Sequence, residues 1–128
     1  MLGPVTILLI AVGGASGAVA RYVVDGFVSE RVGPGFPWGI LIVNLSGAFV
    51  LGLLYALAIE RDVLSAEIRA PLLIGFLGAY TTFSTWMLDS WRLVEAGDLA
   101  AALANLGGSV LLGLIAVVAG LAIGRAVG

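Results

Sequence analysis

Hydroxyl and aromatic side chains interrupt an apolar segment at GAYTTFSTWMLD, residues 78–89. Phe83 and Trp86 are three residues apart and so share one face of a helix, with the hydroxyls of Ser84 and Thr85 on adjoining faces. Ring edges carry positive partial charge and hydroxyls donate hydrogen bonds, so this surface suits a passing anion, which neutral donors bind weakly enough to release. Alternatively, the hydroxyls only join neighbouring membrane helices.

The residues at the start of this stretch favour a break in the helix. Gly75, Gly78 and the adjacent β-branched Thr81 and Thr82 are poor helix formers. Unwinding near residues 78–82 would release backbone carbonyls, including those of Gly78 and Thr81, from helical hydrogen bonds. Such carbonyls need donors, water or a cation, and half-helix ends inside a membrane are a recurrent way to build ion sites.

Further polar groups lie in apolar surroundings. Asn44 must face protein or water, because an unpaired amide is costly in hydrocarbon; it either lines an ion path or joins two helices. The same choice applies to Asn105 and Ser109, which are four residues apart on one helical face. Arg21 is expected at the end of the first helix, where its side chain would reach the membrane interface.

The elements that position these residues are membrane helices. The 128 residues are 61% hydrophobic and 11% charged, far from the composition of soluble domains. About 20 apolar residues span the hydrocarbon core. We therefore expect an all-α membrane protein, a single domain over residues 1–128 with four transmembrane helices near residues 4–24, 38–59, 71–88 and 99–124.

Composition also excludes several classes of function. The chain has no cysteine and no histidine, which removes disulfides, thiolate metal sites and the usual proton shuttle. It has no lysine and a net charge of −2, so it offers no basic surface to nucleic acid. The first apolar stretch lacks an early basic residue and exceeds a signal-peptide core in length, so we expect it to remain as a helix. The lipid bilayer is the only partner that composition implies.

The connectors carry the remaining local signals. Residues 25–39 contain Pro34, Pro37 and several glycines, which predict a loop. Residues 60–71 predict a short surface helix that stops before Pro71.

Small residues recur at four-residue spacing in the first and fourth helices. Gly13 and Gly17 share one face, as do Ala116, Gly120 and Gly124. This spacing lets membrane helices approach closely, and it favours ordinary packing inside the chain over a dedicated dimer face.

Basic residues are divided evenly between the two expected sides of the membrane. One side is assigned Arg21, Arg31 and Arg92, and the other Arg61, Arg69 and Arg125. Because an excess of basic residues in cytoplasmic loops sets orientation, this chain has no strong preference. Either a single exposed charge decides the orientation, or copies insert both ways and pair as an antiparallel, dual-topology dimer.

Three motifs resemble a known family in their order and spacing: GGASGAVARY at 13–22, NLSGAFVLG at 44–52 and GFLGAYTTFST at 75–85. The chain closely resembles the small fluoride channels of the Fluc, or CrcB, family. The resemblance implies two four-helix subunits assembled upside down to one another, with the third helix broken at midmembrane. It also implies two fluoride pores per dimer and a central structural sodium ion (Na⁺).

The resemblance assigns roles to individual residues. The backbone carbonyls of Gly78 and Thr81 would bind the sodium. Asn44 would hydrogen-bond fluoride and Phe83 would present its ring edge. The full set of implied pore residues is Asn44, Phe83, Trp86, Ser84, Thr85, Arg21 and Ser109.

Two positions depart from the family pattern. Trp86 stands where a second phenylalanine is usual, and its indole adds an N–H donor to an aromatic edge. Asn105 stands where the register suggests a tyrosine.

The function expected from this resemblance is a fluoride-selective passive channel that exports F⁻ from the cytoplasm across the plasma (inner) membrane and prevents fluoride toxicity. It is not an enzyme, and its partner is a second copy of itself or a paired homologous subunit. A small proton-coupled multidrug exporter is the alternative, but it needs a membrane-embedded carboxylate, usually in the first helix, which has no acid before Asp25. A scaffold subunit would have no use for a broken, hydroxyl-rich helix.

Overall fold

The computed structural model describes residues 3–127, which fold into helices and short connections. Residues 1, 2 and 128 of the predicted domain lie outside the described residues. In chain order the helices are α1 (Pro4–Val32), α2 (Trp38–Tyr55), η1 (Ala56–Glu60), α3 (Ala66–Arg69), η2 (Ala70–Phe76), α4 (Leu77–Tyr80), α5 (Phe83–Glu95) and α6 (Leu99–Ala126). The segments η1 and η2 are π-helical, and each continues or begins a longer helical run.

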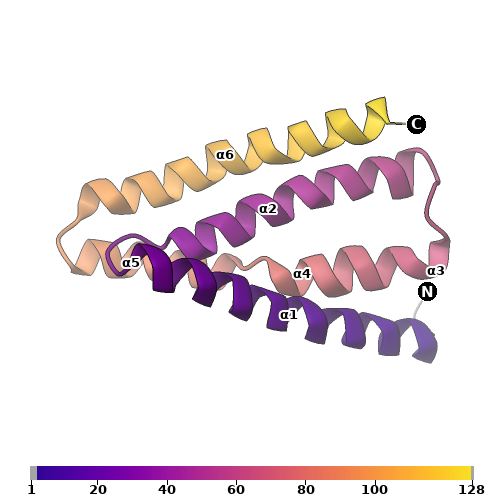
Figure 1. Ribbon diagram of the computed structural model, residues 1–128, viewed down its shortest axis with the longest axis horizontal. Helices are drawn as coiled ribbons and strands as arrows, with labels where there is room; N and C mark the ends of the chain where they lie inside the picture. Colours follow the sequence, from indigo (N-terminus) through magenta and orange to yellow (C-terminus); the bar gives the residue numbers. More distant parts are fainter. Residues whose placement is uncertain (1–2, 128) are drawn as a thin grey trace.

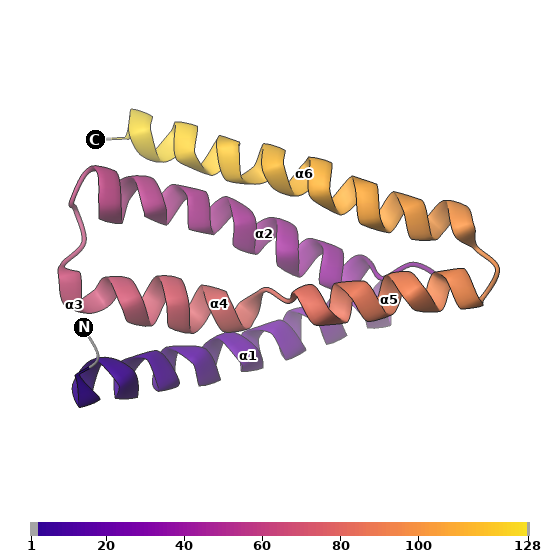
Figure 2. The same ribbon diagram turned by 180° about the vertical axis from the view of Figure 1, so that it is seen from behind.

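The helices form an up-and-down bundle. α2 packs along α6 on one side and against α1 on the other, while α1 also packs on η2 and α4. The run from α3 through α5 crosses the bundle beside α1 and α2, with an interruption near its middle (Figures 1 and 2). The first turn of α1 and the last turn of α6 lie at the same end (Figure 1).

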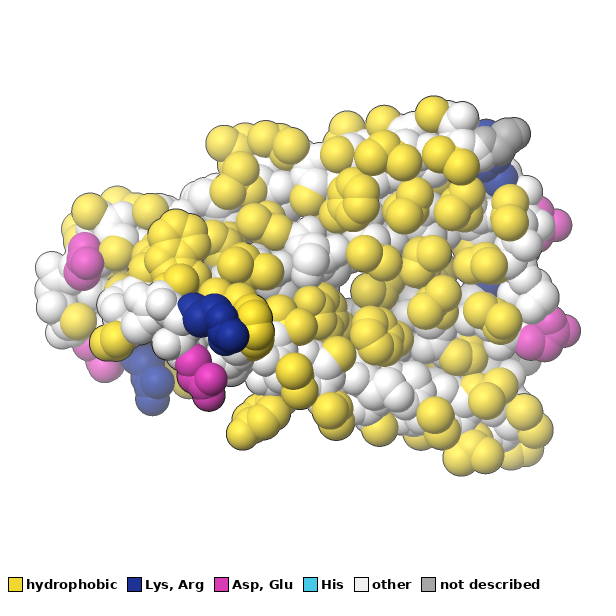
Figure 3. All heavy atoms as spheres, in the orientation of Figure 1, with side chains coloured by type: hydrophobic (Ala, Val, Ile, Leu, Met, Phe, Trp, Pro, Cys, Tyr) yellow, Lys and Arg dark blue, Asp and Glu magenta, His cyan; other side chains and the backbone are white. Residues whose placement is uncertain are grey.

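This architecture confirms the predicted all-α membrane protein. Among residues 3–127, three helical segments are each long and apolar enough to cross a membrane: Pro4–Val32, Trp38–Glu60 and Leu99–Ala126. The remaining predicted span, which is the third segment along the chain, is interrupted between α4 and α5 and so is not one continuous helix. Hydrophobic side chains cover the middle of the molecular face, and acidic and basic side chains gather towards the two ends (Figure 3).

The first helix is longer than predicted, since α1 includes residues 25–32 of the expected loop. Arg31 donates a hydrogen bond to the carbonyl of Phe27 at 3.1 Å, and its guanidinium lies 3.4 Å from the centre of the Phe27 ring. Such contacts one turn apart stabilise a helix. α1 stops at Gly33, whose φ of 74° suits glycine. The prolines therefore follow the helix end rather than preventing the helix.

The third segment is also longer than predicted at both ends. The expected surface helix exists as α3, but it continues through Pro71 into η2 instead of stopping before it. Pro71 is the second residue of η2. At the other end of the segment, α5 continues to Glu95 rather than ending near residue 88. There Gly97, with φ of 80°, turns the chain towards α6.

The glycine faces pack inside the chain, as predicted. A Cβ atom added to Gly13 or Gly17 would collide with the backbone of η2. On α6, the same addition to Gly120 or Gly124 would collide with α2 or η1. Backbone-to-backbone contact of this kind fixes α1 against the third segment and α6 against the second.

Charged residues near the end that carries both described termini are largely paired. Arg125 forms a bidentate ion pair with Glu60, with both N–O distances at 2.8 Å, and Arg69 pairs with Asp62. Arg61 donates to the backbone carbonyl of Arg125 at 2.6 Å. The contacts of Glu60 and Arg61 with Arg125 tie the end of η1 to the last turn of α6, and the Arg69–Asp62 pair ties α3 to the connection before it.

Candidate functional site

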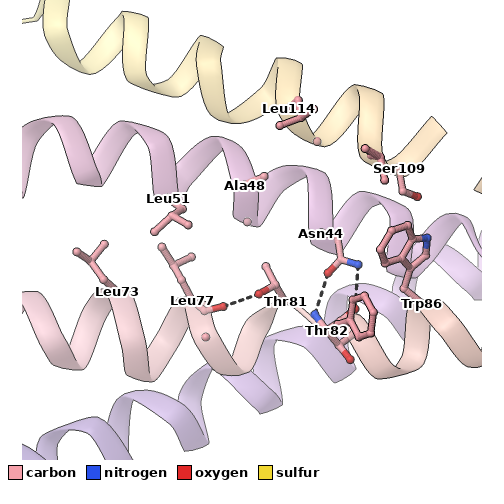
Figure 4. Close-up of a pocket in the computed structure, with 15 residues that line it drawn as sticks. Asn44, Ala48, Leu51, Leu73, Leu77, Thr81, Thr82, Trp86, Ser109 and Leu114 are labelled. Atoms are coloured by element: carbon pink, nitrogen blue, oxygen red, sulfur yellow. Dashed lines mark hydrogen bonds between the residues drawn. The ribbon is translucent and has the colours of Figure 1, made fainter. Parts of the chain in front are cut away.

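The third segment breaks at Thr81 and Thr82, near the middle of the bundle (Figures 1 and 4). Both residues have extended backbones, with φ and ψ of −81° and 155° at Thr81 and −147° and 121° at Thr82. The predicted break is confirmed, but it is narrower than residues 78–82. Gly78 stays helical within α4, where the N–H and the hydroxyl of Thr81 both donate to the carbonyl of Leu77, at 3.1 and 3.0 Å.

Asn44 of α2 replaces the hydrogen bonds that the break removes. Its Nδ2 donates to the Thr82 carbonyl at 3.1 Å, and its Oδ1 accepts from the Thr82 N–H at 2.9 Å (Figure 4). In an unbroken helix that N–H would donate to the carbonyl of Gly78. These two hydrogen bonds stabilise the break. Because an amide nitrogen carries two hydrogens and only one of them is donated to Thr82, Asn44 has a second N–H.

Arg21 lies beside the break, not at the end of the bundle where it was predicted. α1 continues about three turns beyond Arg21. The Arg21 Nε donates to the carbonyl of Ala79 at 3.2 Å. Ala79 is in the last turn of α4, so the guanidinium lies at the negative end of this half-helix and serves a carbonyl that the break has freed.

The α5 helix begins in a cluster of hydroxyls. The Thr82 hydroxyl accepts from the N–H of Thr85 at 3.3 Å, which caps the helix. The same oxygen lies 3.3 Å from the Thr85 hydroxyl and 3.4 Å from that of Ser84. The predicted polar residues Ser84 and Thr85 are therefore adjacent in space, and part of their hydrogen-bonding capacity serves the cap.

The two predicted aromatic residues contact each other. The rings of Phe83 and Trp86 have centroids 5.7 Å apart at an angle of 79°, an edge-to-face arrangement. Phe83 is 70% exposed. The Trp86 indole Nε1 donates to the backbone carbonyl of Asn105 on α6 at 3.0 Å. The donor by which Trp86 differs from phenylalanine is thus already engaged inside the protein.

An open groove of about 480 Å³ lies between α2, the broken segment and α6 (Figure 4). It brings together six of the predicted site residues, namely Asn44, Gly78, Thr81, Phe83, Trp86 and Ser109. Among the described lining residues none is charged. Arg21, Ser84 and Thr85 do not line this groove.

Asn105 has a structural position that the sequence left open. It is 1% exposed, and its Nδ2 donates to the Ser90 hydroxyl at 2.9 Å. Ser90 in turn donates to the carbonyl of Trp86 at 2.8 Å. Asn105 therefore joins α6 to α5, which is the helix-joining role rather than the ion-path role. Sequence reasoning missed Ser90, because nothing in its local pattern reveals a partner on another helix.

Comparison with known proteins identifies the family. Residues 8–121 match the family described as CrcB-like protein, Camphor Resistance (CrcB). The chain belongs to the CrcB family. The matched region of this CrcB chain includes every predicted site residue, from Arg21 to Ser109.

Individual relatives of this CrcB chain are similar over nearly their whole length. A protein from Solidesulfovibrio magneticus is 48% identical over 91% of this chain and 93% of its own. A protein from Hahella chejuensis is 44% identical over 93% and 94%, and one from Rhizobium meliloti is 46% identical over 94% and 96%. All three are named fluoride-specific ion channel FluC.

A second, more polar hollow of about 700 Å³ lies at the end of the CrcB bundle that carries the α1–α2 connection. Its lining includes Thr85, Asp25, Asp89 and Arg92. Because α1 extends to Val32, Asp25 belongs to the first helix, and Ser29 donates to its Oδ1 at 3.2 Å. Thr85 thus faces a charged hollow, whereas Phe83 faces the apolar groove.

Proposed function

We propose that this multi-pass membrane protein is a fluoride-selective passive ion channel that exports F⁻ from the cytoplasm and so prevents fluoride toxicity. Family membership and the names of relatives that are 44–48% identical support this function. A channel makes and breaks no covalent bond, so the protein is not an enzyme. The observation that carries the proposal is the Asn44–Thr82 contact, which holds open the break where α5 begins.

The groove supplies neutral groups that suit a small anion. Phe83 is exposed beside Asn44, so fluoride meets a ring edge and the remaining amide N–H of Asn44. Beyond the groove, the hydroxyls of Ser84 and Thr85 lie beside that of Thr82, and Thr85 lines the charged hollow, so we propose that they extend the row of donors. Because no described lining residue of the groove is cationic, fluoride is bound without being held permanently.

The open groove also favours assembly with a second subunit. Gly78 and Gly113 border it, and a Cβ atom at either position would have no neighbour within 4 Å. Bare backbone beside an apolar groove allows close approach by another membrane helix. We propose an antiparallel dual-topology dimer with two pores, formed by two copies of this chain or by this chain and a paired homologous subunit.

The residues at the break fit a structural sodium ion. The Thr82 N–H donates to Asn44, so the Gly78 carbonyl has lost its helical donor, and Thr81 is extended. Unwound backbone carbonyls are recurrent ligands of sodium in membrane proteins. In the dimer we propose, the carbonyls of Gly78 and Thr81 from both subunits bind Na⁺. When bound, the ion supplies positive charge that offsets the partial negative charge of these carbonyl oxygens.

Reconstitution tests the proposed function. Protein is purified into liposomes loaded with fluoride and chloride, and release of each anion is followed with ion-selective electrodes after addition of a potassium ionophore. We expect electrogenic fluoride release with chloride retained. Equal leak of both anions, or release of neither, contradicts the proposal. Proton-driven uptake of a cationic dye without fluoride release would identify the multidrug exporter instead.

A further inference from the structure

Ser109 is among the pore residues that the family resemblance implies, but the unpaired state of its hydroxyl is not explained by the proposed pore. Its oxygen is buried, yet it makes no hydrogen bond with any residue that the structure describes. Ser109 lies on α6 and lines the apolar groove together with Phe83 and Trp86 (Figure 4). A buried hydroxyl without a partner is costly, so its state calls for a physical reason.

Serine in a membrane helix donates its hydroxyl to a carbonyl three residues earlier, as Ser46 does to Val43, or four residues earlier, as Ser90 does to Trp86. For Ser109 the acceptor four residues earlier is the carbonyl of Asn105. Ser16 on α1 also shows the four-residue arrangement, since its hydroxyl donates to the carbonyl of Val12 at 3.0 Å. Ser109 does not follow it.

Trp86 explains the difference. A backbone carbonyl has two lone pairs. One lone pair of the Asn105 carbonyl accepts the helical N–H of Ser109, as α6 requires. The other accepts the indole N–H of Trp86 at 3.0 Å. With both lone pairs in use, the Asn105 carbonyl is no longer open to the Ser109 hydroxyl.

We propose that Trp86 is a positioning residue whose indole N–H occupies the Asn105 carbonyl and so keeps the Ser109 hydroxyl available as a hydrogen-bond donor to the anion in the groove. This inference rests on the proposed fluoride channel function. It gives the tryptophan at this position a role that a phenylalanine cannot perform, since phenylalanine has no N–H. In Trp86→Phe, the Ser109 hydroxyl is expected to donate to Asn105 and cease to serve the anion.

A double-mutant cycle tests this coupling. Fluoride efflux is measured from liposomes that contain the wild-type protein, Ser109→Ala, Trp86→Phe or the double variant. Because a hydrogen bond to a charged group is a strong one, we expect each single variant to slow efflux by about tenfold. We expect the double variant to be no slower than Trp86→Phe, because its Ser109 hydroxyl no longer contributes.

A matched control separates this role from a general effect of tryptophan. Trp91 lies on the same helix, is 58% exposed, and donates its indole N–H to Glu95 at 2.6 Å. Trp91→Phe also removes an indole hydrogen bond but does not touch Asn105. We expect it to leave efflux unchanged and to leave the full effect of Ser109→Ala intact.

A residue with the shape of tryptophan at position 86 separates loss of the N–H from a folding defect. Benzothienylalanine incorporated at position 86 keeps the two fused rings and replaces the N–H with sulfur. With this residue, Ser109→Ala should have no further effect. If Ser109→Ala still slows efflux by the same factor in either background, Trp86 does not act through Ser109 and the inference is overturned. Absence of fluoride efflux from wild-type liposomes would instead contradict the channel function itself, so the two failures are distinguishable.

Discussion

The side-chain amide of Asn44 hydrogen-bonds both backbone groups of Thr82, at 3.1 Å to its carbonyl and at 2.9 Å from its N–H. A helix that stops and restarts inside an apolar bundle exposes polar backbone groups that hydrocarbon cannot satisfy. Asn44 satisfies one donor and one acceptor at once, because its side-chain amide both donates and accepts hydrogen bonds. The contact therefore fixes where α5 begins and where Phe83 lies.

We expect Asn44→Asp to lower fluoride efflux by about tenfold or more. An ionised carboxylate still accepts from the Thr82 N–H but cannot donate to the Thr82 carbonyl, and an unmade partly buried hydrogen bond costs about 1–3 kcal/mol. The added negative charge also repels fluoride. Liposome efflux measures the effect, and size-exclusion chromatography checks that the assembly is retained. Unchanged efflux would remove Asn44 from the pore.

Much of this site could be predicted from local sequence, for identifiable reasons. Apolar segments of sufficient length predict membrane helices, and adjacent threonines after Gly78 predict a weak point. The end of α1 could not be predicted, because the polar residues 25–32 are compatible both with a loop and with a helix at a membrane surface. The wrong prediction for Arg21 has the same cause. Because α1 continues beyond Arg21, this residue lies beside Ala79 rather than at the end of the helix.

Contacts between helices were beyond sequence reasoning. The Trp86 indole meets the Asn105 carbonyl because α5 and α6 cross at that depth, and neither residue type predicts the pairing. The same holds for Gly47, whose closeness to the break depends on how α2 crosses α4. Composition and spacing predict which residues are polar in an apolar helix, but packing decides which of them remain free.

We expect Phe83→Ile to reduce fluoride efflux strongly with little loss of stability. Phe83 is 70% exposed, so isoleucine loses little buried area, but it has no positively polarised ring edge. Leu88→Ile is a matched control, because Leu88 is 52% exposed on the same helix and lies outside the groove. Efflux from liposomes and thermal unfolding in detergent are compared. Equal efflux from both variants would show that the ring does not contact the ion.

We expect Gly47→Ala to destabilise the break. A Cβ atom at Gly47 would collide with the methyl group of Thr81 and approach Cδ2 of Tyr80 to 3.3 Å. Overpacking of this kind typically costs about 1–3 kcal/mol. Gly26→Ala on α1 is the control, because a Cβ atom there has no neighbour within 4 Å, and alanine favours a helix. Thermal unfolding should show a lower midpoint for Gly47→Ala alone, and equal midpoints would contradict the tight contact.

Dual topology predicts that one labelled position is reached from both sides of the membrane. The chain has no cysteine, so a single introduced thiol reports its own position without background. Ala96→Cys lies at the end of α5, and Val63→Cys lies in the η1–α3 connection at the opposite end of the bundle (Figure 1). Val63 is 63% exposed, and Ala96 is also exposed, so a maleimide can reach both.

In intact cells, an impermeant maleimide should label about half of each variant, and permeabilisation should allow the other half to react, because a chain without an orientation preference inserts both ways. Complete labelling of one variant together with none of the other would show a single orientation and would leave assembly with a paired, oppositely oriented subunit as the route to an antiparallel dimer.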